Sequence, residues 1–252
     1  MDFVFDLDGT ICFKGQRISR KISNGLLELK RQGHRIIFAS ARPIRDLLPV
    51  LPEEFHDEYL IGGNGSLISH QSKILSSESF SDRLITKLIE WIQHYHLTYL
   101  IDGEWDYAYT GPDHHPILQN VDPHKLAKNI ELNQLQSIIK VLILSCKQKE
   151  SLIEQLLHEH VTIHLHQGED IIDLSPPGIS KWNALQKIGV CQGEFIAFGN
   201  DANDICMFKE AKHSVMVGHH QELSTYATQN VTVEEMEGNI DEILKKAIEI
   251  GR

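Results

Sequence analysis

The chain has 252 residues, of which 41% are hydrophobic and 23% charged, a composition typical of a folded globular protein. Its 24 Lys and Arg against 35 Asp and Glu give a net charge of −11, which argues against binding to a nucleic-acid backbone. No apolar run approaches the roughly 18 residues of a membrane span, and the acidic start at Asp2 is unlike a secretory signal. The four cysteines form no Cys-x-x-Cys pair, so we expect reduced thiols in a cytoplasmic protein. Taken with the charge and the lack of a long apolar run, we expect neither membrane nor nucleic-acid partners.

The first third of the chain alternates between buried strands and helices. Strands are predicted at 3–6, 35–40 and 59–61, and helices at 22–32 and 43–48. Ser19 is a candidate N-cap for the first helix, and Gly33 is a candidate stop signal. This βαβαβ order is typical of an α/β fold, in which a parallel sheet carries helices on both faces.

The pattern changes after a polar, linker-like stretch at 76–79 and returns after Pro176-Pro177-Gly178. Between them we expect helices at 82–94 and 150–158, and strands at 97–101, 106–110, 138–145, 161–166 and 171–174. After Pro176-Pro177-Gly178 we expect helices at 181–188, 204–211 and 234–251, and strands at 194–198 and 214–217. We therefore predict an α/β core formed by residues 1–80 and 177–252, split by an α+β insertion at residues 81–176.

Two carboxylates follow the first strand, in the sequence Asp6-Leu7-Asp8-Gly9-Thr10. Open parallel sheets place binding sites beyond the carboxyl ends of their strands, and a period of two puts Asp6 and Asp8 on the same side of an extended chain. A divalent cation relieves their repulsion, and Mg²⁺ favours oxygen ligands, water and phosphate. The pair therefore suits a metal-assisted phosphoryl reaction in which one carboxylate attacks and the other transfers protons.

Three further segments carry polar side chains at a strand end or a helix start. The second strand ends in Ser40-Ala41-Arg42, Lys181 opens a helix, and Gly199 to Asp204 follow a buried strand. Together with Asp6 and Asp8, they supply a nucleophile, a hydroxyl, a cation and an acidic metal loop. Phosphoryl transfer needs this set because its catalysis depends on positioning and charge neutralisation.

In this order, the four segments resemble the four motifs of the haloacid dehalogenase (HAD) superfamily. The insertion lies between the second and third motifs, and Asn64-Gly65 and Gly178-Ile179-Ser180-Lys181 resemble the Cof-like subfamily. The resemblance covers the whole chain. It implies a Rossmann-like core with an inserted mixed α/β cap domain. It also implies a Mg²⁺-dependent phosphatase for sugar phosphates or other small phosphorylated metabolites.

The resemblance also implies roles for individual residues. Asp6 would attack phosphorus and carry the aspartyl-phosphate, and Asp8 would protonate the leaving oxygen and then activate water. The residues implied for phosphate or substrate binding are Ser40, Ala41, Arg42, Asn64, Lys181 and Asn203. The residues implied for Mg²⁺ binding are Asp6, Asp8 through its backbone carbonyl, Asn200 or Asp201, and Asp204 as an indirect partner.

The fourth motif departs from the family's usual pattern, which begins Gly-Asp. Here Asn200 follows Gly199, and Asp201 comes one residue later. Asn200 would bind the metal through its amide oxygen and give a less acidic site, or a small shift would bring in Asp201, which equally fits a turn. A second hypothesis therefore stays open, in which a catalytically weakened protein of this fold binds a phosphorylated metabolite in a regulatory role.

Some of these polar residues also fit a purely structural role. Ser40 also fits a cap for the helix near Pro43, and Arg42 equally fits a structural pair with an acidic side chain. The 15 histidines include His164 and His166 on one face of a predicted strand, and the adjacent pair His219-His220. No His-Glu-x-x-His or Cys/His spacing in the sequence indicates a zinc site.

Overall fold

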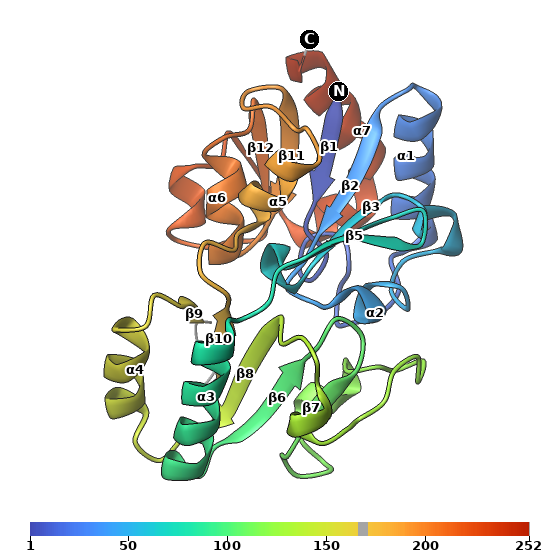
Figure 1. Cartoon of the computed structure of the whole chain (residues 1–252). Coiled ribbons are helices and arrows are strands. Elements are labelled where there is room, and N and C mark those ends of the chain that lie inside the picture. The colour runs from blue at the N-terminus through green and yellow to red at the C-terminus, as the bar shows by residue number, and fades with distance from the viewer. Residues whose placement is uncertain (166–170, 252) are drawn as a thin grey trace. The chain divides into compact units, whose positions relative to one another are not determined.

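The computed structural model describes residues 1–165 and 171–251 (Figure 1), and the chain divides into two compact units. The first unit comprises Met1–Leu75 and Ser180–Arg252, and the second comprises Ser76–Ile179. The expected borders were 80/81 and 176/177, and whether each unit folds as a domain of its own stays a prediction. In the described part of the chain, no helix has the length and apolarity needed to cross a membrane.

An eight-stranded sheet forms the centre of the first unit, in the order β13-β12-β11-β1-β2-β3-β4-β5. Its parallel strands are β1 (Asp2–Phe5), β2 (Arg35–Ala39), β3 (Tyr59–Gly62), β11 (Phe195–Gly199), β12 (His213–Val217) and β13 (Gln229–Val231). The expected parallel α/β core is therefore confirmed. Because parallel strands end at one edge of a sheet, the loops after β1, β2, β3 and β11 meet at that edge.

The sheet ends in a hairpin that the sequence analysis missed. Strand β4 (Leu67–His70) pairs antiparallel with β3, and β5 (Lys73–Ser77) is the edge strand. The turn between them, Gln71-Ser72, has φ of 49° and 59°, the positive values that a tight hairpin turn requires. The sheet is thus mixed, not wholly parallel, and the stretch expected to be a linker from residue 76 begins inside β5.

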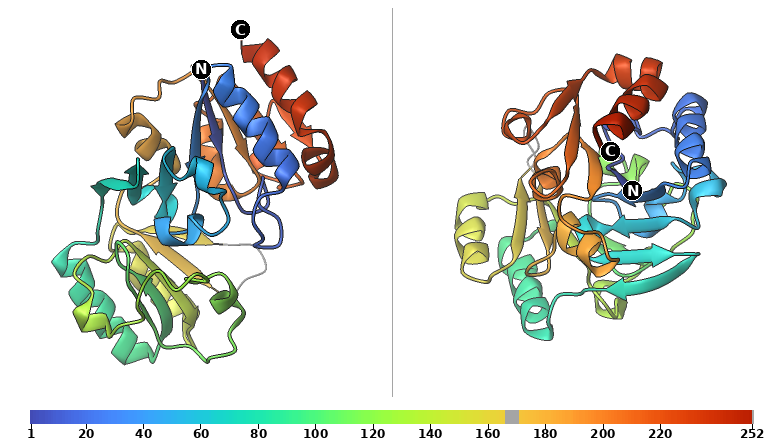
Figure 2. Two further views of the ribbon diagram at one scale, coloured as in Figure 1. Left: turned by 90° about the vertical axis from the view of Figure 1, so that its right-hand side faces the viewer. Right: turned by 90° about the horizontal axis from the view of Figure 1, so that it is seen from above.

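Helices cover both faces of this sheet. Figure 2 shows α1 (Arg20–Arg31) and α7 (Val233–Gly251) side by side on one face, and α5 (Lys181–Lys187) and α6 (Ile205–Phe208) on the other. Ser19 caps α1 as expected, because its hydroxyl accepts a hydrogen bond from the Ile22 N–H. The short elements of this unit are α2 (Ile44–Leu47), η1 (Glu53–Phe55), η2 (Gly63–Gly65), η5 (Ala202–Asp204) and η6 (Leu223–Thr225).

The centre of the first unit is apolar on both sides of β1. Phe3, Val4 and Phe5 are fully buried, and the Phe5 ring stacks on Phe198 of the neighbouring strand at a centroid distance of 4.5 Å. Each such side chain contributes roughly 1.5–3 kcal/mol to the free energy of folding through burial. The strand that leads into Asp6 is therefore firmly held.

The second unit is built on an antiparallel sheet with helices on one face. Its strand order is β7-β6-β8-β10-β9, and helices α3 and α4 pack over apolar side chains of the sheet. The elements are α3 (Asp82–Tyr95), β6 (Thr98–Asp102), β7 (Tyr107–Tyr109), η3 (Pro116–Gln119), η4 (Leu132–Gln134), β8 (Lys140–Ser145), α4 (Lys149–Leu157), β9 (Thr162–Leu165) and β10 (Ile172–Ser175). This is the α+β character expected of the insertion. His166, at the end of the predicted strand 161–166, lies outside the described residues.

A buried histidine on β12 predicts a pH dependence of stability. Burial lowers the pKa of His213 below 6.5, although its hydrogen bond with Gln229 opposes this shift. The folded state then binds this proton less tightly than the unfolded state does. The stabilisation is present above pH 6.5 and is lost as the pH falls through the folded-state pKa.

We expect urea denaturation to show a smaller loss of stability between pH 7.5 and pH 5.5 for His213→Gln than for the wild type. His219→Gln, at an exposed position, serves as the control and should behave like the wild type. Equal losses in the wild type and His213→Gln would contradict this prediction.

Candidate active site

The carboxylate of Asp6 lies at the carboxyl end of β1. Its backbone N–H donates to the Phe198 carbonyl at 2.9 Å, so the residue is fixed by the sheet itself. Its side chain is buried: Oδ1 accepts a hydrogen bond from Lys181 Nζ at 2.6 Å, and Oδ2 accepts one from the Thr10 hydroxyl at 3.0 Å. Both oxygens of the predicted nucleophile are therefore oriented by neighbouring groups.

Lys181 joins two buried carboxylates. It is the first residue of α5, whose N-terminus is capped by Ser180 accepting from the Asn183 N–H at 3.1 Å. Its ammonium donates to Asp6 Oδ1 and to Asp204 Oδ1, each at 2.6 Å. Burial opposes the positive charge of Lys181, but the two carboxylates outweigh that effect and raise its pKa. Lys181 is therefore a constant cation at neutral pH.

The buried side chains of Asp6, Asp204 and Lys181 do not form a neutral group. Burial is the largest cause that raises the pKa of Asp6, to about 7, and Asp204 adds to it while Lys181 opposes it. Two carboxylates share one ammonium, so one negative charge is left over when both are ionised. A cation bound nearby would favour the ionised form of Asp6, and only an ionised carboxylate can act as a nucleophile.

The loop after β11 is folded tightly around Asp204. Asp204 Oδ2 accepts the backbone N–H groups of Asn200 at 2.8 Å and of Asp201 at 3.1 Å. A Cβ on Gly199 would lie 2.5 Å from Asp204 Cγ, so only glycine fits there. The helix expected at 204–211 is wrong in detail, because a 3₁₀ turn, η5, precedes the short α6.

The two candidate metal ligands of this loop point to different neighbours. Asn200 Oδ1 lies 3.2 Å from the Thr10 hydroxyl, the same group that donates to Asp6 Oδ2. Asp201 Oδ1 lies instead 3.4 Å from Nε2 of His220. The structure thus brings the Asn200 amide oxygen beside Asp6 and holds the Asp201 carboxylate beside a histidine.

The residues around Asp6 fit a hard divalent cation. In the described part of the chain, no three His, Cys, Asp or Glu side chains are grouped to hold a metal, so a site here depends on mixed donors. One Thr10 hydroxyl contacts Asp6 Oδ2 and Asn200 Oδ1, which brings a carboxylate and an amide oxygen together. Mg²⁺ is commonly held by one or two carboxylates, with waters and substrate phosphate completing its coordination.

The second motif contacts Asp8. Arg42 donates from Nε and Nη2 to the two carboxylate oxygens of Asp8, at 2.7 and 2.6 Å. The expected pairing of Arg42 with an acidic side chain is present, and the Asp8 side chain remains 47% exposed. Ser40 is buried, and its hydroxyl accepts from the Arg42 N–H at 3.1 Å. The hypothesis that Ser40 caps α2 is wrong, because the N-cap is Pro43.

The turn after β3 joins the second and fourth motifs. The Asn64 N–H donates to the Ser40 carbonyl at 3.0 Å, and Asn203 Nδ2 donates to Asn64 Oδ1 at 3.2 Å. Asn64 has φ of 60°, a left-handed conformation that asparagine tolerates well. Ala41 lies in the turn that follows Ser40. Three of the residues predicted to bind phosphate, Ser40, Asn64 and Asn203, therefore lie on segments that are hydrogen-bonded to one another.

Two glycines permit close approaches between these loops. A Cβ on Gly9 would lie 2.1 Å from Asn200 Nδ2, and Gly9 has φ of 80°. A Cβ on Gly65 would lie 2.4 Å from the Ser180 carbonyl oxygen, at φ of 115°. Larger residues at these positions would separate the first motif from the fourth, and the turn after β3 from α5.

Sequence reasoning gave no role to two residues that contact this site. Thr10 was part of the first motif, and its spacing of four residues from Asp6 carried no signal of the hydroxyl contact. His220 belongs to a histidine pair considered only for zinc, and its contact with Asp201 spans 19 residues of sequence. Of the other histidines considered, His164 lies on β9 and His166 is outside the described residues.

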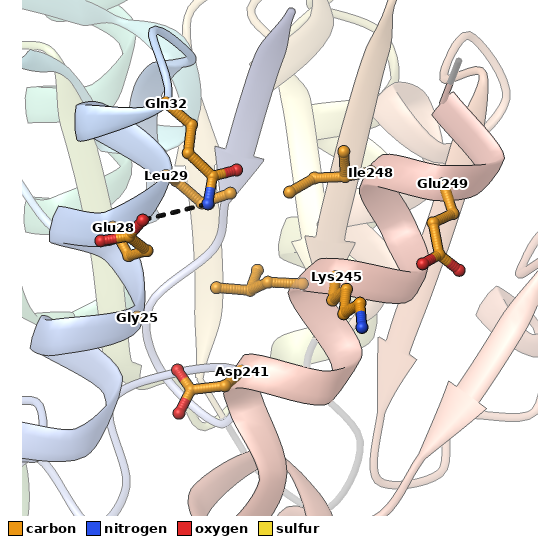
Figure 3. Close-up of a pocket in the computed structure, with 9 residues that line it drawn as sticks. Gly25, Glu28, Leu29, Gln32, Asp241, Lys245, Ile248 and Glu249 are labelled. Atoms are coloured by element: carbon orange, nitrogen blue, oxygen red, sulfur yellow. Dashed lines mark hydrogen bonds between the residues drawn. The ribbon is translucent and has the colours of Figure 1, made fainter.

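A groove elsewhere in the first unit is distinct from this site. It lies between α1 and α7 and has a volume of about 420 Å³ (Figure 3). Leu29, Leu244 and Ile248 supply its apolar surface, and Glu28 and Asp241 are among its acidic side chains. None of the predicted motif residues lines it.

Comparisons with known proteins agree with the fold and with the family that the sequence resembles. A family model described as haloacid dehalogenase-like hydrolase matches residues 3–244. The 5-amino-6-(5-phospho-D-ribitylamino)uracil phosphatase YbjI of Escherichia coli is 25% identical over 224 residues, 83% of this chain and 82% of its own length. The HMP-PP phosphatase of Cronobacter sakazakii is 22% identical over 234 residues, 85% of this chain and 83% of its own.

Solved structures show the same fold. A sugar phosphatase of HAD subclass IIB superposes with a TM-score of 0.79 at 17% identity, over 99% of both chains. A haloacid dehalogenase-like hydrolase from Bacteroides thetaiotaomicron superposes with a TM-score of 0.79 at 21% identity, over 98% of both chains. The prediction of a Cof-like phosphatase is confirmed at the level of family and enzyme class, and the chain belongs to the haloacid dehalogenase-like hydrolases.

Proposed function

We propose that this enzyme is a Mg²⁺-dependent phosphatase that hydrolyses small phosphomonoesters through an aspartyl-phosphate on Asp6. The observation that carries the proposal is the buried Asp6 carboxylate, held between Lys181 and Thr10 at the carboxyl edge of the sheet. Asp8, two residues further on, supplies an exposed second carboxylate. The E. coli relative is named for a small phosphorylated metabolite, which supports this substrate class.

The reaction proceeds in two proton-balanced steps. An Asp6 oxygen attacks phosphorus, the ester bond breaks, and Asp8 gives its proton to the leaving oxygen. Asp8 then takes a proton from water, the water oxygen attacks the aspartyl-phosphate, and Asp6 and inorganic phosphate are released. Arg42 holds both oxygens of Asp8 in its ionised form, the form left after the first step, and Asp8 must release at least one of these hydrogen bonds when it carries a proton.

The remaining motif residues hold the transferring group. Lys181 and the Ser40 hydroxyl bind phosphoryl oxygens, and the loops of Asn64 and Asn203 surround them. Asp6, the Asp8 backbone carbonyl and Asn200 would hold the Mg²⁺, and Asp204 would fix the loop that carries Asn200. When bound, the ion supplies positive charge beside Asp6 and the phosphoryl oxygens.

Phosphate release tests the proposal directly. The purified protein is assayed with and without Mg²⁺ on sugar phosphates, nucleotides and cofactor phosphates. We expect release that requires Mg²⁺ and that favours a subset of the sugar phosphates and related small metabolites. A folded protein that released no phosphate from any of these compounds would overturn the proposal.

Asn200 is the specific observation that favours the second function, binding of a phosphorylated metabolite in a regulatory role. We expect Asn200→Asp to bind Mg²⁺ about tenfold more tightly, because a carboxylate replaces an amide beside Asp6, and tenfold corresponds to about 1.4 kcal/mol. Calorimetric titration of both proteins measures the change. Asn230→Asp, which adds the same charge at an exposed position on β13, is the control.

The two functions then separate by turnover. Turnover that is already metal-dependent in the wild type supports the phosphatase. Tight binding of a phosphorylated metabolite without turnover, with activity appearing only in Asn200→Asp, supports the regulatory function. An unchanged Mg²⁺ affinity in Asn200→Asp would remove Asn200 from the metal site.

A further inference from the structure

The histidine pair after β12 contains one residue that reaches the fourth motif. His220 is mostly buried, with 11% of its side chain exposed, and its Nε2 lies 3.4 Å from Asp201 Oδ1. Its other ring nitrogen, Nδ1, accepts the Leu223 N–H at 3.1 Å. A nitrogen that accepts carries no proton, so the neutral ring bears its proton on Nε2, the nitrogen that lies near Asp201. The neighbouring His219 is exposed.

Asp201 in turn holds the start of η5. Its Oδ1 accepts the Ala202 N–H at 2.7 Å, and its own N–H donates to Asp204 Oδ2. Asp204 is bound through its other oxygen to Lys181, which contacts Asp6. The contact of His220 with Asp201, followed by hydrogen bonds from Asp201 to Asp204 and from Lys181 to both Asp204 and Asp6, therefore connects the loop after β12 with the predicted nucleophile.

We propose that His220 is a positioning residue that fixes the orientation of the fourth-motif loop. His220 holds the Asp201 carboxylate on the side of the loop that faces the histidine. The preceding residue, Asn200, then faces the opposite side, where Asp6 lies. The backbone of Asp201 is extended, with φ of −133° and ψ of 173°, and successive side chains of an extended chain point to opposite sides. Fixing the Asp201 side chain therefore restricts the direction of Asn200. His220 thereby selects Asn200, not Asp201, as the oxygen donor beside Asp6.

This inference rests on the proposed function only for the identity of the cation. The choice of Asn200 over Asp201 as the residue that faces Asp6 is a property of the loop, and it exists before any cation binds. Without His220, Asp201 Oδ1 keeps the Ala202 N–H, and the loop gains alternative conformations that cation binding must then remove. The free energy needed to remove these conformations weakens cation binding. It leaves the reaction almost unchanged once the cation site is saturated.

Binding of Mn²⁺, followed by electron paramagnetic resonance on the full chain, tests the proposal. We expect His220→Ala to raise the Kd for Mn²⁺ about tenfold, the lower end of the effect seen when a group that orients a metal site from outside is removed. Asp201→Ala should have the same effect, and the double variant should be no weaker than either single one. His220→Gln should bind nearly as the wild type does, because one carboxamide can accept from Leu223 and donate to Asp201. His219→Ala is the matched control and should not change binding.

A second readout does not depend on the metal. In the metal-free protein, we expect the amide hydrogens of Asn200 and Asp201 to exchange faster in His220→Ala than in the wild type or in His219→Ala. Unchanged exchange at these two amides, or additive losses of affinity in the double variant, would overturn the role of His220. A wild type that bound no Mn²⁺ would instead contradict the proposed function, and the exchange comparison would still decide the role of His220.

Discussion

Asp6→Asn is expected to abolish phosphate release, with a loss of about 10⁴-fold or more in kcat. The amide is a poor nucleophile, and its NH₂ group would meet either the Lys181 ammonium or the Thr10 hydroxyl in place of an acceptor oxygen. The fold should tolerate the change, because burial already raises the pKa of Asp6 to about 7 and the protein accommodates its neutral form. Phosphate release and circular dichroism on the same sample measure activity and folding.

Asp2→Asn is the matched control for this variant. Asp2 begins the same strand and pairs with Arg35 at the end of β1 opposite Asp6. It should keep wild-type turnover, since the change lies away from the carboxyl edge. If Asp6→Asn retained more than a few per cent of the wild-type rate, another residue would have to be the nucleophile.

Lys181→Met is expected to have the largest effect on stability. The variant leaves Asp6 and Asp204 buried together without their shared cation, and breaking a buried ion pair from one side costs about 3–5 kcal/mol. For a protein of this size, the corresponding fall in Tm is roughly 6–20 °C. Activity should be lost as well, because the ammonium that we propose binds the phosphoryl oxygens is removed. Thermal unfolding in metal-free buffer measures the stability.

A triple variant separates charge from packing. Adding Asp6→Asn and Asp204→Asn to Lys181→Met makes the site neutral, and we expect it to recover most of the lost stability. Lys73→Met, at an exposed position on β5, removes the same charge from the surface and should leave Tm nearly unchanged. A wild-type Tm in Lys181→Met would show that the buried carboxylates do not depend on this ammonium.

The sequence predicted which loops meet, because a parallel sheet brings the carboxyl ends of its strands to one edge. Asp6, Ser40 and Asn200 each follow such a strand, and continuous apolar runs in the sequence located the strands. The positions of these residues in the fold are thus largely consequences of topology. Their chemical roles come from the family resemblance and stay predictions that the variants above test.

The side-chain partners were beyond the reach of periodicity. The contact of Asn203 with Asn64 depends on a left-handed backbone conformation at Asn64, which no spacing rule specifies. The hairpin of β4 and β5 was missed because its turn, Gln71-Ser72, lacks the Asn or Gly that marks such turns. The contact of His220 with Asp201 joins two loops whose relative position only the folded sheet defines.

The pairing of β1 with β11 also has a consequence for the order of events during protein synthesis. Residues 2–5 pair with residues 195–198, which are synthesised about 190 residues later. Residues 76–179, by contrast, form the second unit from one continuous stretch of chain. At about 5–20 residues per second, a ribosome needs roughly 10–40 s to cover that distance. The apolar strand that leads into Asp6 is therefore synthesised long before its partner β11, and until β11 is made one of its edges is open to chaperones and to other nascent chains.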